Sequence, residues 1–279
     1  MPASIHQLPD PIFKLRHVAF QWLCERDASA KATALVSMRW QELDVDPQGV
    51  WTEPATGFPG RPARPVLVAP TQLARRSAQT PQGRAALLHA VAHIELNAIH
   101  LALDAVWRYA GLPVPFYRDW MQVAVDEARH FGLLTAHLQT LGFAYGDFPA
   151  HDALWEMAHR TRNDVLARMA LVPRTLEARG LDATPAMRAK LAQAGDIRAA
   201  EILDVILQDE IGHVAIGNRW FRWLCAERSL DPLIAFEQLQ TDHRAPKPRG
   251  PFNLAARRAA GFTTAELDAL EAADKAARR

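Results

Sequence analysis

Two five-residue segments of the chain carry the same pattern of acidic residues and histidine. Residues 126–130 read Asp-Glu-Ala-Arg-His, and residues 209–213 read Asp-Glu-Ile-Gly-His. Each segment lies in a long stretch whose apolar residues recur with helical spacing. Because a helix repeats every 3.6 residues, a Glu and a His three positions apart project from the same face. Each segment therefore presents one carboxylate and one imidazole together, which is half of a metal site.

Two such halves complete a metal centre when two further helices add one carboxylate each, as in carboxylate-bridged di-iron and di-manganese centres. A single Glu-x-x-His on a helix is usually a coincidence of surface residues. Two copies in apolar stripes favour a metal, because burying two carboxylates and two imidazoles without a compensating ion is very costly. The predicted ligands are Glu127, His130, Glu210 and His213, whereas four lone histidines are interpreted as structural: His93, His100, His137 and His159.

The helices that must position these ligands are predicted in residues 81–231, which we expect to form the main domain. Pro81 suits the first turn of a helix, and Gly111 followed by proline ends it. No stretch before the tail alternates between apolar and polar residues for long enough to be a strand, so the predicted fold class is all-α. The predicted helices cover residues 81–111, 115–141, 152–180 with a kink at Pro173, 185–194 after an N-cap at Thr184, and 196–227.

Residues 1–80 are predicted to be an extension that packs on the outside of the main domain. A helix is predicted at residues 13–26, and a second apolar stretch covers residues 32–43. Prolines then follow at short intervals from Pro47 to Pro70, too densely for a helix or a central strand. The region lacks the apolar content for a core of its own, so we do not expect a separate domain.

Residues 232–279 are predicted to be a helical tail. A short helix is expected near residues 233–239, and Thr264 is expected to cap a last helix over residues 265–277. The segment 245–251 between them is basic and contains three prolines, which indicates a loop. The excess of positive charge in the tail is modest and indicates a solvated surface rather than a nucleic-acid interface.

The carboxylate from the first of the main helices is predicted to be Glu95 rather than Asp104. Glu95 lies on the apolar stripe of that helix. The short connection to the next helix makes the two helices antiparallel neighbours. At 1.5 Å per residue, Glu95 and the pair Glu127 and His130 then lie at one height, roughly 20 Å from the turn.

The carboxylate from the third helix is less well determined. The acidic residues there are Glu156, Asp164 and Glu177. Glu177 follows two apolar residues at helical spacing, but it stands close to the predicted end of its helix, whereas Glu210 lies well inside the fourth helix. Periodicity alone places Glu177 only slightly ahead of Glu156.

The order of these residues, together with three short segments, resembles the ferritin-like superfamily. The segments are 92–99 (Ala-His-Ile-Glu-Leu-Asn-Ala-Ile), 176–182 (Leu-Glu-Ala-Arg-Gly-Leu-Asp) and 209–213. Over roughly residues 10–255 the chain is similar to an uncharacterised bacterial ferritin-like family, one of the domains of unknown function. The resemblance implies a four-helix bundle with a dinuclear metal centre, and it raises Glu177 above Glu156 as a ligand. It implies no substrate.

The acidic residue before each Glu has a predicted role of its own. Asp126 and Asp209 are rotated by about 100° from the ligand face, which lets them reach across to the neighbouring helix. A histidine that binds a metal normally donates its second N–H to a carboxylate or a carbonyl. We therefore hypothesise that Asp126 orients His213 and that Asp209 orients His130; the alternative is that both are simple surface charges.

The bulk properties of the 279 residues are those of a globular protein with a sizeable core. A formal net charge of +1 creates no field that would attract nucleic acid or a membrane surface. No uninterrupted apolar run approaches the roughly 20 residues of a membrane span, and the first residues lack the pattern of a secretory signal. Two distant cysteines, Cys24 and Cys225, favour a reduced cytoplasmic protein without disulfides.

The ligand set suits iron or manganese, because carboxylates and imidazoles are hard to borderline donors that leave coordination positions open. The leading prediction is a di-iron oxidase or oxygenase that uses O₂ to oxidise a small organic molecule, with an electron donor and a homodimer left open. Two Fe ions, two Mn ions or a mixed pair are compatible with these ligands. The six predicted ligands are Glu95, Glu127, His130, Glu177, Glu210 and His213.

Other functions known on this fold are weighed against that prediction. The long terminal additions disfavour a cage-forming storage ferritin, and the absence of Cys-x-x-Cys disfavours a rubrerythrin-type peroxidase. A ribonucleotide-reductase radical subunit needs a Tyr about one turn after a ligand His, whereas Phe-Gly-Leu-Leu follows His130. A di-manganese catalase, a tRNA-modifying hydroxylase and a non-enzymatic metal-binding protein remain alternatives.

Overall fold

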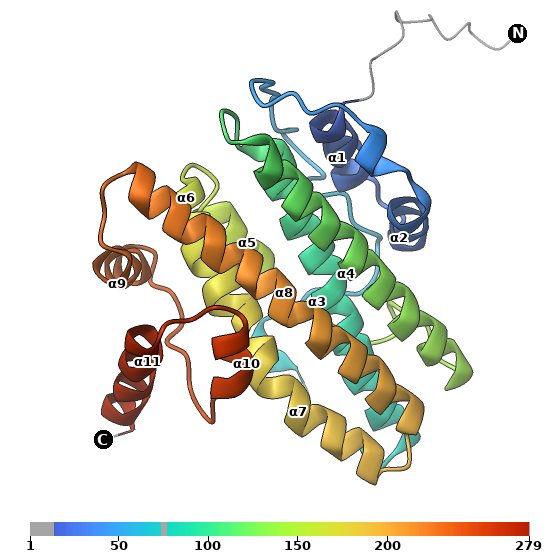
Figure 1. Cartoon of the computed structure of the whole chain (residues 1–279). Helices are drawn as coiled ribbons and strands as arrows, with labels where there is room; N and C mark the ends of the chain where they lie inside the picture. Colours follow the sequence, from blue (N-terminus) through green and yellow to red (C-terminus); the bar gives the residue numbers. More distant parts are fainter. Residues whose placement is uncertain (1–13, 74–76, 279) are drawn as a thin grey trace, which may run out of the picture.

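The computed structural model describes residues 14–73 and 77–278 of the chain (Figure 1). All regular secondary structure in these residues is helical, and the β-type contacts among them are two isolated bridges. The all-α prediction is therefore confirmed. The predicted helix start at Phe13, and the first residues that bear on a secretory signal, lie outside the described residues.

Four long helical segments carry the candidate ligands. In Figure 1, α3 and α4 lie beside each other, and α8 lies between α4 and the segment that ends in α7. The helices pack in the same order: α3 packs against α4, and α4 packs against α8. The other side of α8 packs against the segment that ends in α7. The segments are α3 (Pro81–Arg108), α4 (Val114–Thr140), α8 (Ile197–Glu227), and the successive elements α6 (Val165–Leu171), η3 (Val172–Glu177) and α7 (Ala178–Gln193).

Local signals start two of these helices where the sequence predicts. Thr80 Oγ1 accepts a hydrogen bond from the N–H of Gly83 (3.1 Å), with Pro81 in the first turn of α3. Asp196 Oδ1 accepts a hydrogen bond from the N–H of Ala199 (3.0 Å) at the start of α8. N-caps of this kind stabilise a helix by roughly 1 kcal/mol each. Both predicted starts are confirmed.

The predicted helix over residues 152–180 is wrong in its boundaries. Instead of one helix, α5 (Ala153–Arg160) ends early and α6 starts after a break. The reason is a second N-cap, since Asp164 Oδ1 accepts a hydrogen bond from the N–H of Leu166 (3.0 Å). The side chain of Asp152 makes no such cap for α5.

α7 continues where the sequence predicts a break. Thr184 and Pro185 have the types of an N-cap and a first turn, but both lie inside α7, which ends at Gln193. Packing of α7 against α8 outweighs the local preference of this pair. Glu177 consequently lies in the interior of a long helical segment, not near its end.

The element η3 before α7 is π-helical. It contains Pro173, which has no N–H to donate to an α-helical partner. The hydroxyl of Thr175 donates to the carbonyl of Ala170 (2.9 Å). Gly217 of α8 packs directly on this proline: a Cβ at Gly217 would lie 2.5 Å from the Cβ of Pro173. The π-helical turn is therefore fitted to α8, and such turns are frequent at functional sites.

α4 and α8 run antiparallel and make polar contacts at successive levels. Between residues 119 and 130, each step forward along α4 corresponds to an equal step back along α8. Because both helices carry the same five-residue pattern, this register brings the Asp of each copy next to the His of the other. The contacts in this register are Asp119 with Trp220, Asp126 with His213, and His130 with Asp209. Outside it, His137 contacts Asp196, the N-cap of α8.

The N-terminal helices pack on the outside of α3 and α4. α1 (Leu15–Cys24) packs against α3, and α2 (Ala28–Ser37) packs against α4. Leu15 and Leu23 are fully buried and belong to the same hydrophobic cluster as the core of α3 and α4. The second apolar stretch, residues 32–43, overlaps α2, which Asp27 caps and starts before that stretch.

The C-terminal tail folds against η3. The buried guanidinium of Arg174 in η3 donates to Glu266 Oε1 (2.6 Å). Thr263 and Glu266 form a reciprocal capping box, so Thr263 is the cap of the last helix, and the prediction of Thr264 is wrong by one residue. The first helix of the tail agrees with its prediction, whereas the second is not predicted. The tail helices are α9 (Pro232–Asp242), α10 (Leu254–Ala259) and α11 (Thr264–Ala277).

One described helix, α3, is long and apolar enough to cross a membrane by length and composition. In the folded chain, 83% of its most apolar window is buried. The central helix of a compact fold has this burial and passes the same test. Polar residues interrupt α3 at regular intervals, which is why a search for an uninterrupted apolar run does not find it.

Candidate metal centre

Two groups of candidate ligands meet where α3, α4 and α8 come together. Ligand atoms of Glu95, Glu127 and His130 lie within 4.8 Å of one another. Ligand atoms of Glu127, Glu210 and His213 do the same. Glu127 thus belongs to both groups, and a shared carboxylate is what a bridged pair of metal ions requires.

The side chains of both groups are withdrawn from solvent. Their exposed fractions range from 0% for His130 to 8% for Glu210. Among the described residues, the ion pairs of Glu95 and Glu127 are with the two imidazoles, and no Lys or Arg joins them. Buried carboxylates without a strong cationic partner are costly to keep ionised. The positive charge of the site must therefore come from protonated imidazoles or from a bound cation.

Both imidazoles point the same ring nitrogen toward the carboxylates. His130 Nδ1 lies 3.2 Å from Glu95 Oε2 and 3.2 Å from Glu127 Oε2. His213 Nδ1 lies 3.0 Å from Glu127 Oε1. Each Nδ1 is therefore the nitrogen available to a metal ion at the centre, and each Nε2 points away from the centre.

The two aspartates contact the outward-facing nitrogens. His130 Nε2 lies 2.8 Å from Asp209 Oδ2, and His213 Nε2 lies 3.4 Å from Asp126 Oδ2. Each Asp therefore contacts the histidine that our hypothesis assigns to it. A carboxylate in this position accepts the Nε2 proton and leaves Nδ1 free to bind a metal.

One residue beside the centre is missed by the sequence reasoning. Arg129, two residues after Glu127, forms an ion pair with Asp209 across the α4–α8 interface. Asp209 therefore contacts a guanidinium and an imidazole at the same time. The sequence marks Arg129 only by its position between Glu127 and His130. The ion pair itself could not be predicted from the sequence, because Asp209 belongs to another helix.

Glu177 lies outside both groups, but the charge of Glu127 acts on its carboxyl group. Burial raises its pKa to about 8, and the charge of Glu127 contributes to that rise. Its Oε2 atom is buried without a hydrogen-bond partner, and the same holds for Oε2 of Glu210. The competing candidate, Glu156, is exposed on α5, so it does not reach the centre.

The competing carboxylate on α3 is engaged elsewhere. Asp104 is fully buried and pairs with Arg108 (2.8 Å) and Arg168 (2.5 Å). The four histidines interpreted as structural from the sequence also lie outside the two ligand groups. His137 contacts Asp196, His159 is exposed, and His93 and His100 line a separate cavity.

The carboxylates of the centre differ in their pKa values. Burial and the charge of Glu127 raise the pKa of Glu210 well above its ordinary value, and the same two causes raise the pKa of Glu95 to about 8. Burial opposes ionisation of Glu127, but the charge of His213 and hydrogen bonds from both imidazoles hold its pKa well below the ordinary value. Glu127 is thus the ionised carboxylate of the metal-free centre.

The imidazoles are held in their protonated form. Burial lowers the pKa of His130, but hydrogen bonds to Asp209, Glu127 and Glu95 outweigh it and raise the pKa to about 12. Burial lowers the pKa of His213, but the charge of Glu127 together with hydrogen bonds to Asp126 and Glu127 raises it well above its ordinary value. Protons thus supply the positive charge of the metal-free centre, and binding a metal requires their release.

Comparison with known proteins identifies the family. Residues 20–268 match the family described as "Protein of unknown function (DUF455)". An uncharacterized protein of Haemophilus influenzae is 52% identical over 214 residues, which cover 74% of this chain and 74% of that protein. No solved structure matches the chain. The prediction of an uncharacterised family is therefore confirmed, and the chain belongs to the DUF455 family.

Proposed function

We propose that the chain binds two divalent metal ions, iron or manganese, in a ferritin-like bundle of four helices and uses O₂ to oxidise a small organic molecule. The observation that carries this proposal is the pair of buried ligand groups that share Glu127. The shared carboxylate supports a dinuclear centre over two independent sites, because a single side chain belongs to both groups.

The donor atoms fit two such ions. Each group offers only carboxylate oxygens and an imidazole nitrogen, a set that suits iron and manganese. Glu177 and Glu210 each keep a buried oxygen without a hydrogen-bond partner, and such an acceptor is costly unless a cation or a proton satisfies it. With Glu177 and Glu95 included, four carboxylates offer four negative charges, and two divalent ions balance them in full.

Each ligand has a distinct place in this proposal. Glu127 belongs to both groups and would be the ligand common to the two ions. Glu95 and His130 would help to hold one ion, and Glu210 and His213 the other, with Nδ1 as the nitrogen of each histidine that faces the carboxylates. Glu177 approaches from the third helical segment. The two aspartates accept the Nε2 protons and so fix the tautomer of each imidazole.

The surrounding residues prepare the centre for oxidation chemistry. When bound, the two ions supply electrons to O₂. The side chains of the two ligand groups are only 0% to 8% exposed, and exclusion of bulk water strengthens the electrostatic interactions of the ligands. Glu210 and Glu177 release their protons when the ions bind, because a bound metal needs ionised ligands.

The test is metal analysis followed by reaction with O₂. The protein is expressed in medium supplemented with iron and manganese, and its metal content is measured per chain. Metal-free protein is then loaded with Fe(II) without oxygen and mixed with O₂ in a stopped-flow spectrometer. We expect about two ions per chain, as the two ligand groups require, and a transient visible absorbance after mixing.

The outcomes separate the alternatives. Two ions without an O₂ response would favour di-manganese catalase chemistry, which release of O₂ from hydrogen peroxide would reveal. Two ions without either reaction would favour a non-enzymatic metal-binding protein. Absence of bound metal after supplementation and reconstitution would contradict the proposal.

A further inference from the structure

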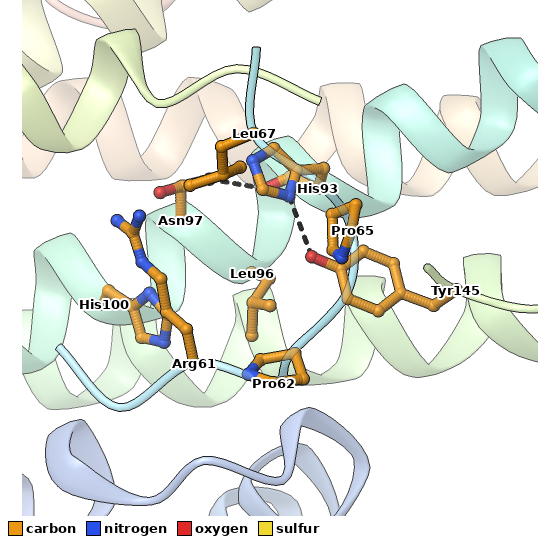
Figure 2. A pocket seen from close by; sticks show the side chains of 9 residues that line it. All are labelled: Arg61, Pro62, Pro65, Leu67, His93, Leu96, Asn97, His100 and Tyr145. Carbon is orange, nitrogen blue, oxygen red and sulfur yellow. Dashed lines mark hydrogen bonds between the residues drawn. The ribbon is translucent and has the colours of Figure 1, made fainter. Parts of the chain in front are cut away.

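A second cluster of buried polar groups lies on the opposite side of α3 from Glu95. His93 and Asn97 are each two positions from Glu95 and therefore project about 160° away from it. They line a small cavity of about 30 Å³ under the loop that contains Arg61. Figure 2 shows Arg61, Asn97 and His100 gathered at one end of this cavity, with His93 and Tyr145 at the other.

The contacts of His100 leave one N–H without an acceptor. His100 is 1% exposed, and its Nε2 lies 2.5 Å from the Nζ of Lys31. When Lys31 is protonated, as it is beside a bound anion, its ammonium group only donates, so Nε2 accepts and Nδ1 carries the ring proton. Nδ1 is buried without a hydrogen-bond partner. His100 therefore offers the cavity a donor.

Arg61 and Asn97 add a second donor and one acceptor. Arg61 Nη1 pairs with Asp152 Oδ2 (2.6 Å), which leaves its buried Nη2 without a partner. The amide nitrogen of Asn97 donates to the carbonyl of His93 (2.9 Å), so the unpartnered amide atom is the acceptor Oδ1. Asn97 is 2% exposed. Buried polar groups are normally paired, so this cluster has the character of a binding site.

The charge around the cavity is positive. Lys31 is 1% exposed, and among the described residues its contacts are His100 and the carbonyl of Gly60 (3.1 Å), with no carboxylate in ion-pair distance. Burial lowers the pKa of Lys31 to about 7. Burial, followed by the charges of Lys31 and Arg61, lowers the pKa of His100 well below its ordinary value. A buried cation of this kind is stabilised by an anion beside it.

We propose that this cavity binds a small oxyanion that carries one hydroxyl group, with bicarbonate as the simplest example. The anion oxygens accept from His100 Nδ1 and Arg61 Nη2, and the hydroxyl donates to Asn97 Oδ1. A water-sized group needs roughly 10–15 Å³ of such space, so the cavity holds two or three groups of that size. Larger ligands such as nucleotides or sugar phosphates do not fit.

The experiment measures anion binding to the full-length protein at neutral pH. Bicarbonate is titrated calorimetrically and by thermal unfolding, because a ligand of the folded state raises Tm in a saturable manner. Formate, which lacks the hydroxyl, and chloride are titrated at the same ionic strength. We expect saturable binding of bicarbonate and at least about tenfold weaker binding of both comparison anions, as loss of a hydrogen bond to a buried acceptor implies.

Variants test the residues and exclude the metal centre. R61Q should weaken bicarbonate binding at least about tenfold, since it removes a charged donor. R64Q, on the same loop and exposed, is the matched control and should bind like the wild type. N97A should bind bicarbonate and formate equally. H213A removes a candidate metal ligand and should leave bicarbonate binding unchanged, so failure of the metal proposal and failure of this one are distinguishable.

Three results would overturn the inference. Absence of saturable binding would leave a cavity that holds only water. Equal binding of chloride, formate and bicarbonate by the wild-type protein would contradict a site for a hydroxylated oxyanion. Loss of binding in H213A, with R61Q unaffected, would place the anion at the metal centre.

Discussion

The two copies of the Asp-Glu-x-x-His pattern are alike in sequence and unequal in the folded protein. Glu127 in α4 is 1% exposed and lies within 3.2 Å of His130 and 3.0 Å of His213. Glu210 in α8 is 8% exposed, and its Oε2 atom has no hydrogen-bond partner. The copy in α4 thus provides the shared carboxylate, and the copy in α8 provides an outer one.

The neighbours of each copy explain the difference. The antiparallel register alone would make the copies equivalent, because each Asp contacts the opposite His. α3 packs against α4 and places Glu95 beside His130, whereas α8 packs against η3 and α7. Arg129 adds a guanidinium to Asp209. The pattern therefore specifies which donor atoms are present, and the surrounding helices decide the role of each donor.

The largest expected effect is that of E127Q, which removes the shared carboxylate. Both ions should be lost, with metal affinities lowered by more than about 100-fold. Changing a residue that only supports a ligand lowers metal affinity by up to about 100-fold, and loss of a ligand common to both ions should cost more. Metal content per chain after dialysis provides the measurement. E201Q, an exposed Glu on α8, is the control. Retention of one tightly bound ion would show that the two groups are independent.

E210Q should have a smaller effect, because Glu210 belongs to one group only. We expect metal content to fall by about one ion per chain, with the other ion held by Glu95, Glu127 and His130. Metal analysis and spectroscopy of the remaining ion measure this. Loss of both ions, as in E127Q, would mean that the two copies are equivalent after all.

The pH dependence of the metal-free protein should also distinguish the copies. Glu95 and Glu177, with pKa about 8, bind more protons in the folded state than in the unfolded state. Their stabilising contribution is present below the ordinary pKa and is lost as the pH rises through about 8, at roughly 1 kcal/mol per pH unit for each group. Glu210 acts in the same direction. Thermal unfolding should therefore show Tm falling from mildly acidic to alkaline pH.

Two variants sharpen this pH test. E210Q mimics the protonated carboxyl and should weaken the fall of Tm with pH. E127Q removes the ionised partner of both imidazoles and should lower Tm throughout the range. Bound metal should abolish the fall, because the ions replace the protons. A Tm that is unchanged with pH in the metal-free wild type would contradict these assignments.

Substitution of the two aspartates should lower metal affinity by moderate and unequal amounts. D209N and D126N each remove the carboxylate that accepts an Nε2 proton, which typically lowers metal affinity about 10–100-fold. D209N should have the larger effect, because its contact with His130 (2.8 Å) is shorter than that of Asp126 with His213 (3.4 Å). Metal affinity by competition with a chelator measures both. Equal or reversed effects would contradict the inequality of the copies.

The smallest effect is expected for R129Q. Arg129 is partly exposed, with 45% of its side chain accessible, and exposed ion pairs contribute roughly 1 kcal/mol or less. Metal affinity should fall by less than about tenfold, and added salt should reduce the difference from wild type. R219Q, which breaks a similar exposed pair with Asp119 between the same helices, should leave metal affinity unchanged.

Helix starts were predictable where a local signal is sufficient. Thr80 with Pro81, and Asp196 before α8, act through hydrogen bonds within one turn, so the sequence contains the whole cause. The region from α5 to α7 was not predictable in the same way. Thr184 and Pro185 suggest a new helix locally, but packing against α8 keeps them inside α7.

The sequence by itself determined the types of the candidate donors and their grouping in pairs, because the spacing of Glu and His on one helix follows from helical geometry alone. Only the tertiary structure decided that Glu127 is shared, that Glu177 lies inside a long helical segment near Glu127 and not at a helix end, and that Arg129 reaches Asp209. These facts depend on distances between helices that are far apart in the chain. No periodicity within one helix encodes such distances.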